Sequence, residues 1–159
     1  MNDFFGEIYC WFETFFGQYL AEHLWGYNCD TQSYDLSNTF NPIGLVNVGI
    51  TLLLVIVYYY AINHPRFSKW KSWLLVLCIA AIIQLFIGYS WTANAYLNGE
   101  IGDCLMNSRN EDGEIINQLI SISDCWGFGV ANMFISIGFF VLFSFSLKWW
   151  SGHAKYSPF

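Results

Sequence analysis

The stretch WLLVLCIAAIIQLFIGYSWTANAYL, residues 73–97, contains no Asp, Glu, Lys or Arg. Two further runs share this property: IGLVNVGITLLLVIVYYYAI, residues 43–62, and WGFGVANMFISIGFFVLFSFSL, residues 126–147. A helix rises 1.5 Å per residue, so about 20 apolar residues cross the hydrocarbon core of a bilayer. The sequence therefore predicts an all-α integral membrane protein with three transmembrane helices.

Acidic and basic residues occupy different segments between these runs. Every acidic residue lies either before Pro42 or in the loop 99–125. The basic residues, apart from Arg109, follow the first and third runs: Arg66, Lys69, Lys71, Lys148 and Lys155. Lys and Arg are retained on the cytoplasmic side, whereas acidic residues have little influence. We expect an outside N-terminus and a cytoplasmic C-terminus, in a bacterial inner membrane or a plasma membrane.

The N-terminal segment has the apolar spacing of an amphipathic helix. Aromatic and aliphatic residues recur three and four positions apart between residues 4 and 24, and glutamates occupy much of the opposite face. Three carboxylates are costly in hydrocarbon, so we expect this helix to lie in the membrane interface. It would pack on the chain's own spans or on a partner. Its expected outer contact surface consists of Trp11, Phe12, Phe15 and Phe16.

These boundaries divide the chain into three parts. Residues 1–42 would form the outer amphipathic helix and a linker. Residues 43–150 would form the transmembrane bundle with its acidic outer loop, 99–125, and residues 151–159 a cytoplasmic tail. Within the loop, Ile115, Ile116, Leu119 and Ile120 have helical spacing and predict a short helix that leads into the third span.

Four cysteines lie in the segments expected outside: Cys10, Cys29, Cys104 and Cys125. Disulfides persist in oxidising compartments, so these residues are disulfide candidates. Pairing between neighbours in sequence, Cys104 with Cys125 and Cys10 with Cys29, is the preferred expectation. Four cysteines allow three connectivities, and cross-pairing would join the N-terminal segment to the loop. Free thiols in a reducing compartment are the alternative.

Among the uncharged polar residues of the apolar runs, five are candidates for a pore lining or for helix packing: Asn47, Thr51, Gln84, Asn132 and Ser136. We expect them to form hydrogen bonds between helices, and a pore lining is the alternative. The runs contain no carboxylate, histidine or basic residue. This absence argues against proton-coupled transport and voltage sensing, which need titratable or charged groups within the membrane.

No sequence pattern indicates catalysis or a cofactor. The histidines are scattered, no Cys or His pair has the spacing of a zinc site, and no nucleophile stands at a recognisable spacing from a base. Six basic residues are too few for nucleic-acid binding. We predict no metal and no cofactor, and we expect bound membrane lipid.

The sequence favours a non-enzymatic multi-pass subunit that packs into a larger membrane complex, with copies of itself or with other subunits. One alternative is a homo-oligomeric channel, in which Asn47, Gln84, Asn132 and Ser136 face a central pore below an acidic mouth. A second alternative is a membrane thiol–disulfide oxidoreductase. Such enzymes use a reactive C-x-x-C pair, which this sequence lacks.

Overall fold

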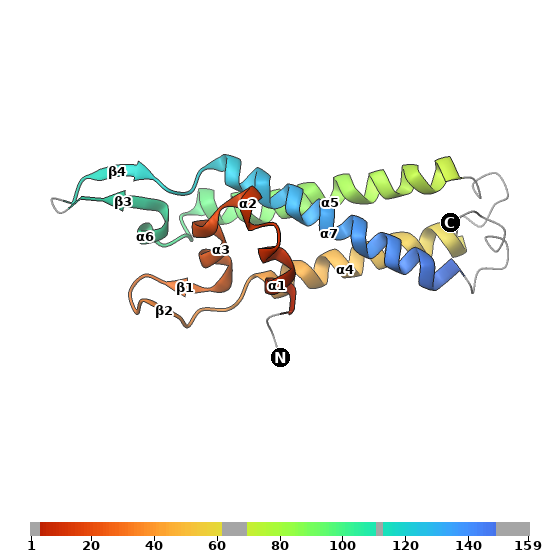
Figure 1. The fold of residues 1–159 in the computed structure, drawn as a ribbon, viewed down its shortest axis with the longest axis horizontal. Helices are drawn as coiled ribbons and strands as arrows, with labels where there is room; N and C mark the ends of the chain where they lie inside the picture. The colour runs from red at the N-terminus through yellow and green to blue at the C-terminus, as the bar shows by residue number, and fades with distance from the viewer. Residues whose placement is uncertain (1–3, 62–69, 111–112, 149–159) are drawn as a thin grey trace.

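The computed structural model of the chain describes residues 4–61, 70–110 and 113–148. Three long helices form a bundle (Figure 1): α4 (Phe40–Ile56), continued by the π-helical turn η1 (Val57–Ala61), α5 (Trp70–Asn98) and α7 (Ile122–Lys148). All three are long and apolar enough to cross a membrane. The prediction of an all-α membrane protein with three spans is confirmed. The tail 151–159 lies outside the described residues, as does most of the connection between the first two spans.

Helix α7 is the central helix of the bundle, and it packs most closely against α5. A Cβ atom at Gly88 of α5 would lie 2.8 Å from the Cβ atom of Asn132 and 3.2 Å from the Cα atom of Gly129, both on α7. Lipid tails give no hydrophobic drive for helix association, so close backbone approach at small residues provides the packing energy. Helix α4 packs mainly on α7 and meets α5 much less.

One end of the bundle carries the short α-helices and the strands of the described residues, and we call this end the cap. It contains α1 (Phe4–Cys10), α2 (Glu13–Phe16), α3 (Gln18–Trp25), β1 (Tyr27–Asn28), β2 (Ser33–Tyr34), α6 (Asp103–Met106), β3 (Asn107–Arg109) and β4 (Ile115–Gln118). The predicted N-terminal helical segment is present as three short helices. Gly17, at φ +79°, separates α2 from α3, and Gly26, at φ +87°, ends α3. These are left-handed backbone conformations that glycine adopts without steric cost.

The prediction of a short helix in the loop 99–125 is wrong. Ile115 and Ile116 belong to strand β4, which pairs antiparallel with β3 and projects away from the bundle (Figure 1). Gly113, at φ +82°, allows the chain to turn, and the Asn110 side chain accepts a 2.8 Å hydrogen bond from the backbone N–H of Glu114. β-Branched residues favour strands, and a helix this short is marginal. Helix α7 begins only at Ile122.

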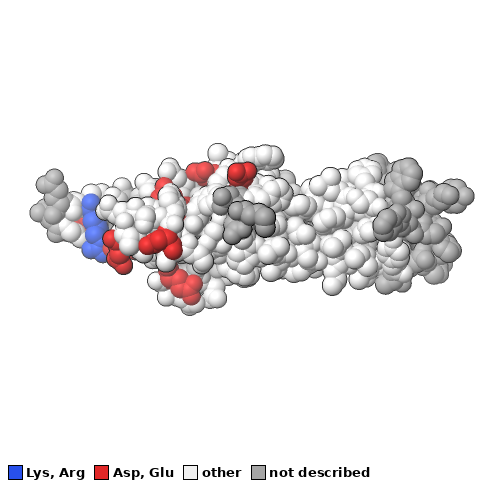
Figure 2. All heavy atoms as spheres, turned by 90° about the horizontal axis from the view of Figure 1, so that it is seen from below, with Lys and Arg blue, Asp and Glu red and all other residues white. Residues whose placement is uncertain are grey.

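The acidic residues of the described part of the chain gather at the cap end, whereas Lys71 lies in the first turn of α5 and Lys148 ends α7. Figure 2 shows acidic side chains over this end of the molecule, while the adjoining bundle surface carries none. The aromatic and aliphatic core consists of two clusters. One cluster fills the junction between cap and bundle around Tyr9, Phe16, Phe40 and Phe128, and a second lies deeper in the bundle around Val55 and Phe140. The cap is therefore an acidic, water-compatible head packed on three helices whose apolar runs contain no charged residue.

Candidate functional site

The five candidate polar residues meet inside the bundle, and we call this cluster the polar network. All five are fully buried: Asn47, Thr51, Gln84, Asn132 and Ser136. The side-chain amide of Asn47 on α4 donates to the side-chain oxygen of Asn132 on α7 at 2.6 Å and to its backbone carbonyl at 2.9 Å. The hydroxyls of Thr51 and Ser136 are 3.1 Å apart.

Gln84 joins the remaining helix to this network. Its side-chain amide on α5 donates to the backbone carbonyl of Asn47 at 3.1 Å. The amide of Asn132 donates in turn to the backbone carbonyl of Gln84 at 2.7 Å. Each of the three spans thus donates to or accepts from both others. Buried polar groups in hydrocarbon are costly without such partners, so the network selects one arrangement of the helices.

Tyr9 of the cap completes the polar network, and the sequence analysis missed it. Its hydroxyl donates to the side-chain oxygen of Asn132 at 2.5 Å. Its ring is fully buried and stacks between Phe40 and Phe128, at centroid distances of 5.3 and 5.2 Å. Burial raises the pKa of Tyr9 above its usual 10, against a smaller lowering by the side chain of Asn47, so the hydroxyl stays a neutral donor.

A sequence signal for Tyr9 existed. The residue shares the helical spacing of Phe5, Phe12 and Phe16, one face of the N-terminal segment, which Tyr19 continues. A buried tyrosine usually finds a hydrogen-bond partner, so a hydroxyl on a packing face points to polar groups opposite. Spacing alone does not give the depth at which such a ring lies, and the partner was therefore not predictable.

The expected outer contact surface divides into two pairs. Phe16 is fully buried with its ring edge-on to Phe128, and Phe12 stacks on Phe134 of α7 at a centroid distance of 6.0 Å. Trp11 and Phe15 point outward, with 81% and 50% of their surface exposed. The N-terminal segment therefore packs on the chain's own helices and still presents two large aromatic side chains.

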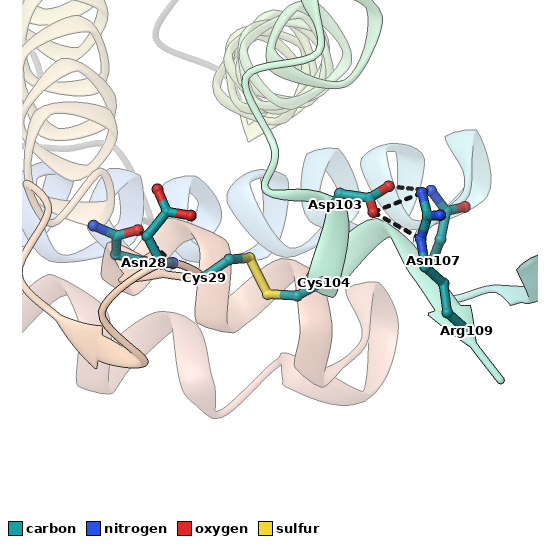
Figure 3. Close-up of a disulfide and its surroundings, with 7 residues drawn as sticks. Asn28, Cys29, Asp103, Cys104, Asn107 and Arg109 are labelled. Atoms are coloured by element: carbon teal, nitrogen blue, oxygen red, sulfur yellow. Dashed lines mark hydrogen bonds and ion pairs between the residues drawn. A yellow bond between two sulfur atoms is a disulfide. The ribbon is translucent and has the colours of Figure 1, made fainter. Parts of the chain in front are cut away.

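The disulfide joins Cys29 to Cys104, so the preferred pairing of neighbouring cysteines is wrong (Figure 3). Cys125 is a free thiol buried in α7, and Cys10 is a free thiol that accepts a hydrogen bond from the Trp25 indole N–H at 3.3 Å. Because Cys29 and Cys104 are bonded to each other, neither is paired with its neighbour in sequence. The bond is one of the cross-pairings, and it joins the N-terminal segment to the loop.

Arg109 occupies the strand beside this disulfide (Figure 3). Its guanidinium lies 2.9 Å from a carboxylate oxygen of Asp103, and Asn107 donates to the other oxygen of the same carboxylate at 2.9 Å. The hydrogen bond from Asn107 lowers the pKa of Asp103 below its usual value, and Arg109 adds to this effect. The basic residue in the acidic loop therefore ties β3 to α6.

The polar side chains of the described residues form contacts that hold the fold together. They contain no group of three or more His, Cys, Asp or Glu side chains that could hold a metal ion. The polar network consists of amides and hydroxyls, which hold helices in register but exchange no protons near neutral pH. No protein-family model matches the sequence, and no curated protein or solved structure matches it. The function must therefore be inferred from the geometry itself.

Proposed function

We propose that the protein is a non-enzymatic multi-pass subunit that packs into a larger homo- or hetero-oligomeric membrane complex. The observation that carries this proposal is a rigidly held cap with unused aromatic surface. Tyr9 and the Cys29–Cys104 disulfide fix the cap, while Trp11 and Phe15 stay exposed on it. Exposed aromatic side chains on an ordered scaffold are typical of the energetically dominant positions of protein interfaces.

The polar network favours a role in helix packing and argues against a pore lining. A channel formed by copies of this chain needs polar side chains on a shared central surface, whereas these five are enclosed within one chain. Thiol exchange receives no similar support. The bonded cysteines are 75 residues apart in sequence, and the spacing that activates a C-x-x-C pair is missing.

In this proposal the cap lies on the outer side of a bacterial inner membrane or a plasma membrane. The support is the distribution of Lys and Arg in the sequence, which favours an outside N-terminus. A disulfide between cap segments fits the same side, because outer compartments are oxidising. The partner would then contact the cap at the outer membrane surface through Trp11 and Phe15.

Native mass spectrometry of the unreduced protein, extracted from its own host in mild detergent, tests the proposal. We expect assemblies heavier than the 18.4 kDa chain. Replacing Trp11 and Phe15 together by serine should dissociate them, whereas Leu97→Ser, at a residue 75% exposed on the end of α5, should not. A lone chain in every preparation would contradict the proposal. A ring of identical chains that conducts ions in planar bilayers would support the channel instead.

A further inference from the structure

A groove runs along the side of the molecule between α5 and the cap. Its volume is about 1010 Å³, near the upper end of the range for ligand pockets. One wall is a face of α5 from Ile82 to Ala95, and the other is formed by the end of α3 and the chain that leads into α4. The groove lies outside the polar network and shares none of its residues.

The groove is apolar at one end and polar at the other. Its bundle end is lined by Ile82, Ile83, Phe86 and Ile87 of α5, within a helix apolar enough to span a membrane. Ile82 and Phe86 are both more than half exposed, so this end opens toward the hydrocarbon. Its cap end is lined by His23, Ser37, Thr39, Ser90, Asn94 and Glu100. This gradient is that of an amphiphile embedded in the membrane.

The length of the groove matches one leaflet. From Ile82 to Ala95 the helix rises about 20 Å. One leaflet, with its share of the headgroup region, is also about 20 Å thick, half of the ~40–45 Å bilayer. An acyl chain beside Ile82 and Phe86 would therefore place its headgroup next to Asn94 and Glu100. A soluble ligand would have no reason to occupy the half of the groove that faces hydrocarbon.

The charge at the polar end selects among headgroups. Glu100 is the charged residue there, and neither Lys nor Arg lines the groove. The described cation of the cap, Arg109, is engaged by Asp103. Burial lowers the pKa of His23, although Glu100 opposes this effect, so the imidazole is mainly neutral at pH 7. An anionic headgroup would meet a carboxylate without a counter-charge, whereas an ammonium group would be attracted.

We propose that this groove binds one phospholipid with a primary-amine headgroup, of the phosphatidylethanolamine type. The acyl chain packs on Ile83 and Phe86, the hydroxyls of Ser37 and Ser90 donate to the phosphate, and the ammonium group donates to Glu100. Nonspecific contact of lipids with the apolar surface of the bundle would not discriminate among headgroups. A preference for an amine headgroup therefore distinguishes the proposed site from such contact. The inference does not depend on the subunit role proposed above.

The test is native mass spectrometry of the full-length protein in detergent, with phosphatidylethanolamine, phosphatidylglycerol or phosphatidylcholine added separately at equal concentration. We expect phosphatidylethanolamine to give the most stable one-lipid adduct. Its preference over phosphatidylglycerol should be about two- to fivefold, the ratio that one exposed charge pair provides. Phosphatidylcholine should bind more weakly than phosphatidylethanolamine, because its quaternary ammonium donates no hydrogen bond.

Two variants separate the parts of the proposal. Ile83→Trp should fill the apolar end and remove the adduct, whereas Leu75→Trp, at an exposed α5 residue outside the groove, should not. Glu100→Gln should keep the adduct but abolish the amine preference, and Glu114→Gln, at an exposed carboxylate outside the groove, should leave it unchanged. An intact Cys29–Cys104 disulfide confirms the fold of each variant. Equal adducts for all three lipids, or an unaffected Ile83→Trp, would mean a nonspecific lipid shell and overturn the inference.

Discussion

At the scale of single residues, Asn132 is the connecting point of the molecule. Its side-chain oxygen accepts from Tyr9 and Asn47, and its amide donates to Gln84, so one side chain links α1, α4 and α5 to α7. Each hydrogen bond between membrane helices contributes only about 0.6 kcal/mol on average. The importance of the residue lies in the number of elements it joins, because an unpaired amide in hydrocarbon is costly.

Tyr9→Phe tests the link between cap and bundle. The change removes one hydroxyl and preserves the ring between Phe40 and Phe128, and the Asn132 oxygen keeps its bond from Asn47. We expect a loss of about 0.5–1.5 kcal/mol in the free energy of unfolding, measured by denaturation in mixed detergent micelles. The matched control is Tyr19→Phe at an exposed tyrosine of α3, which should change stability little. An equal effect of both variants would contradict this role of Tyr9.

At the scale of elements, the molecule depends on how closely α5 approaches α7. Gly88 and Gly129 let the two backbones meet, which places Gln84 within reach of Asn132. The sequence contains these glycines, but it does not show the register between the helices. The same limit applies to the hairpin β3–β4. Isoleucine spacing fitted a short helix, and only the pairing of Ile115 with Arg109 across the turn decided for a strand.

Gly88→Ala should destabilise the bundle by about 1–3 kcal/mol, because the added methyl group overpacks the contact with Asn132 and Gly129. Gly138→Ala on α7 is the control, since nothing lies within 4 Å of the position of its Cβ atom. Its effect should stay within about 0.5 kcal/mol. Denaturation of both variants in mixed detergent micelles gives the comparison. A tolerated Gly88→Ala would show that the helices separate there at little cost.

The disulfide also acts at the scale of elements, because it joins segments that are far apart in sequence. Removing it with Cys29→Ser and Cys104→Ser frees a loop of 75 residues, and we expect a loss of about 2–4 kcal/mol. Protease cleavage in the β1–β2 turn should become faster, while the bundle stays protected. Cys10→Ser serves as the control because that thiol is free. On non-reducing gels the double variant should lose the mobility shift that wild type shows upon reduction, and Cys10→Ser should retain it.

At the scale of the whole molecule, acidic residues gather at the cap end, and five of the six Lys and Arg residues follow the first and third apolar runs in the sequence. The positions of these basic residues predict the orientation, because Lys and Arg are retained on the cytoplasmic side. We expect Ile116→Cys in β4 to react with a membrane-impermeant maleimide in intact cells. Ser68→Cys, in the connection between the first two spans, should react only after permeabilisation. Both changes are made with Cys10 and Cys78 replaced by serine. The reverse labelling pattern would place the cap on the cytoplasmic side, and with it the surface formed by Trp11 and Phe15.

The sequence by itself determined what depends on the properties of residues summed along the chain. Three charge-free runs predict three spans, because the free-energy cost of a charge in hydrocarbon does not depend on which segments pack together. The five polar residues were identifiable for the same reason. Tertiary structure alone decided which groups meet: Cys29 with Cys104, Tyr9 with Asn132, and β3 with β4. These pairings depend on distances between segments remote in sequence, and hydrophobicity and periodicity contain no information about such distances.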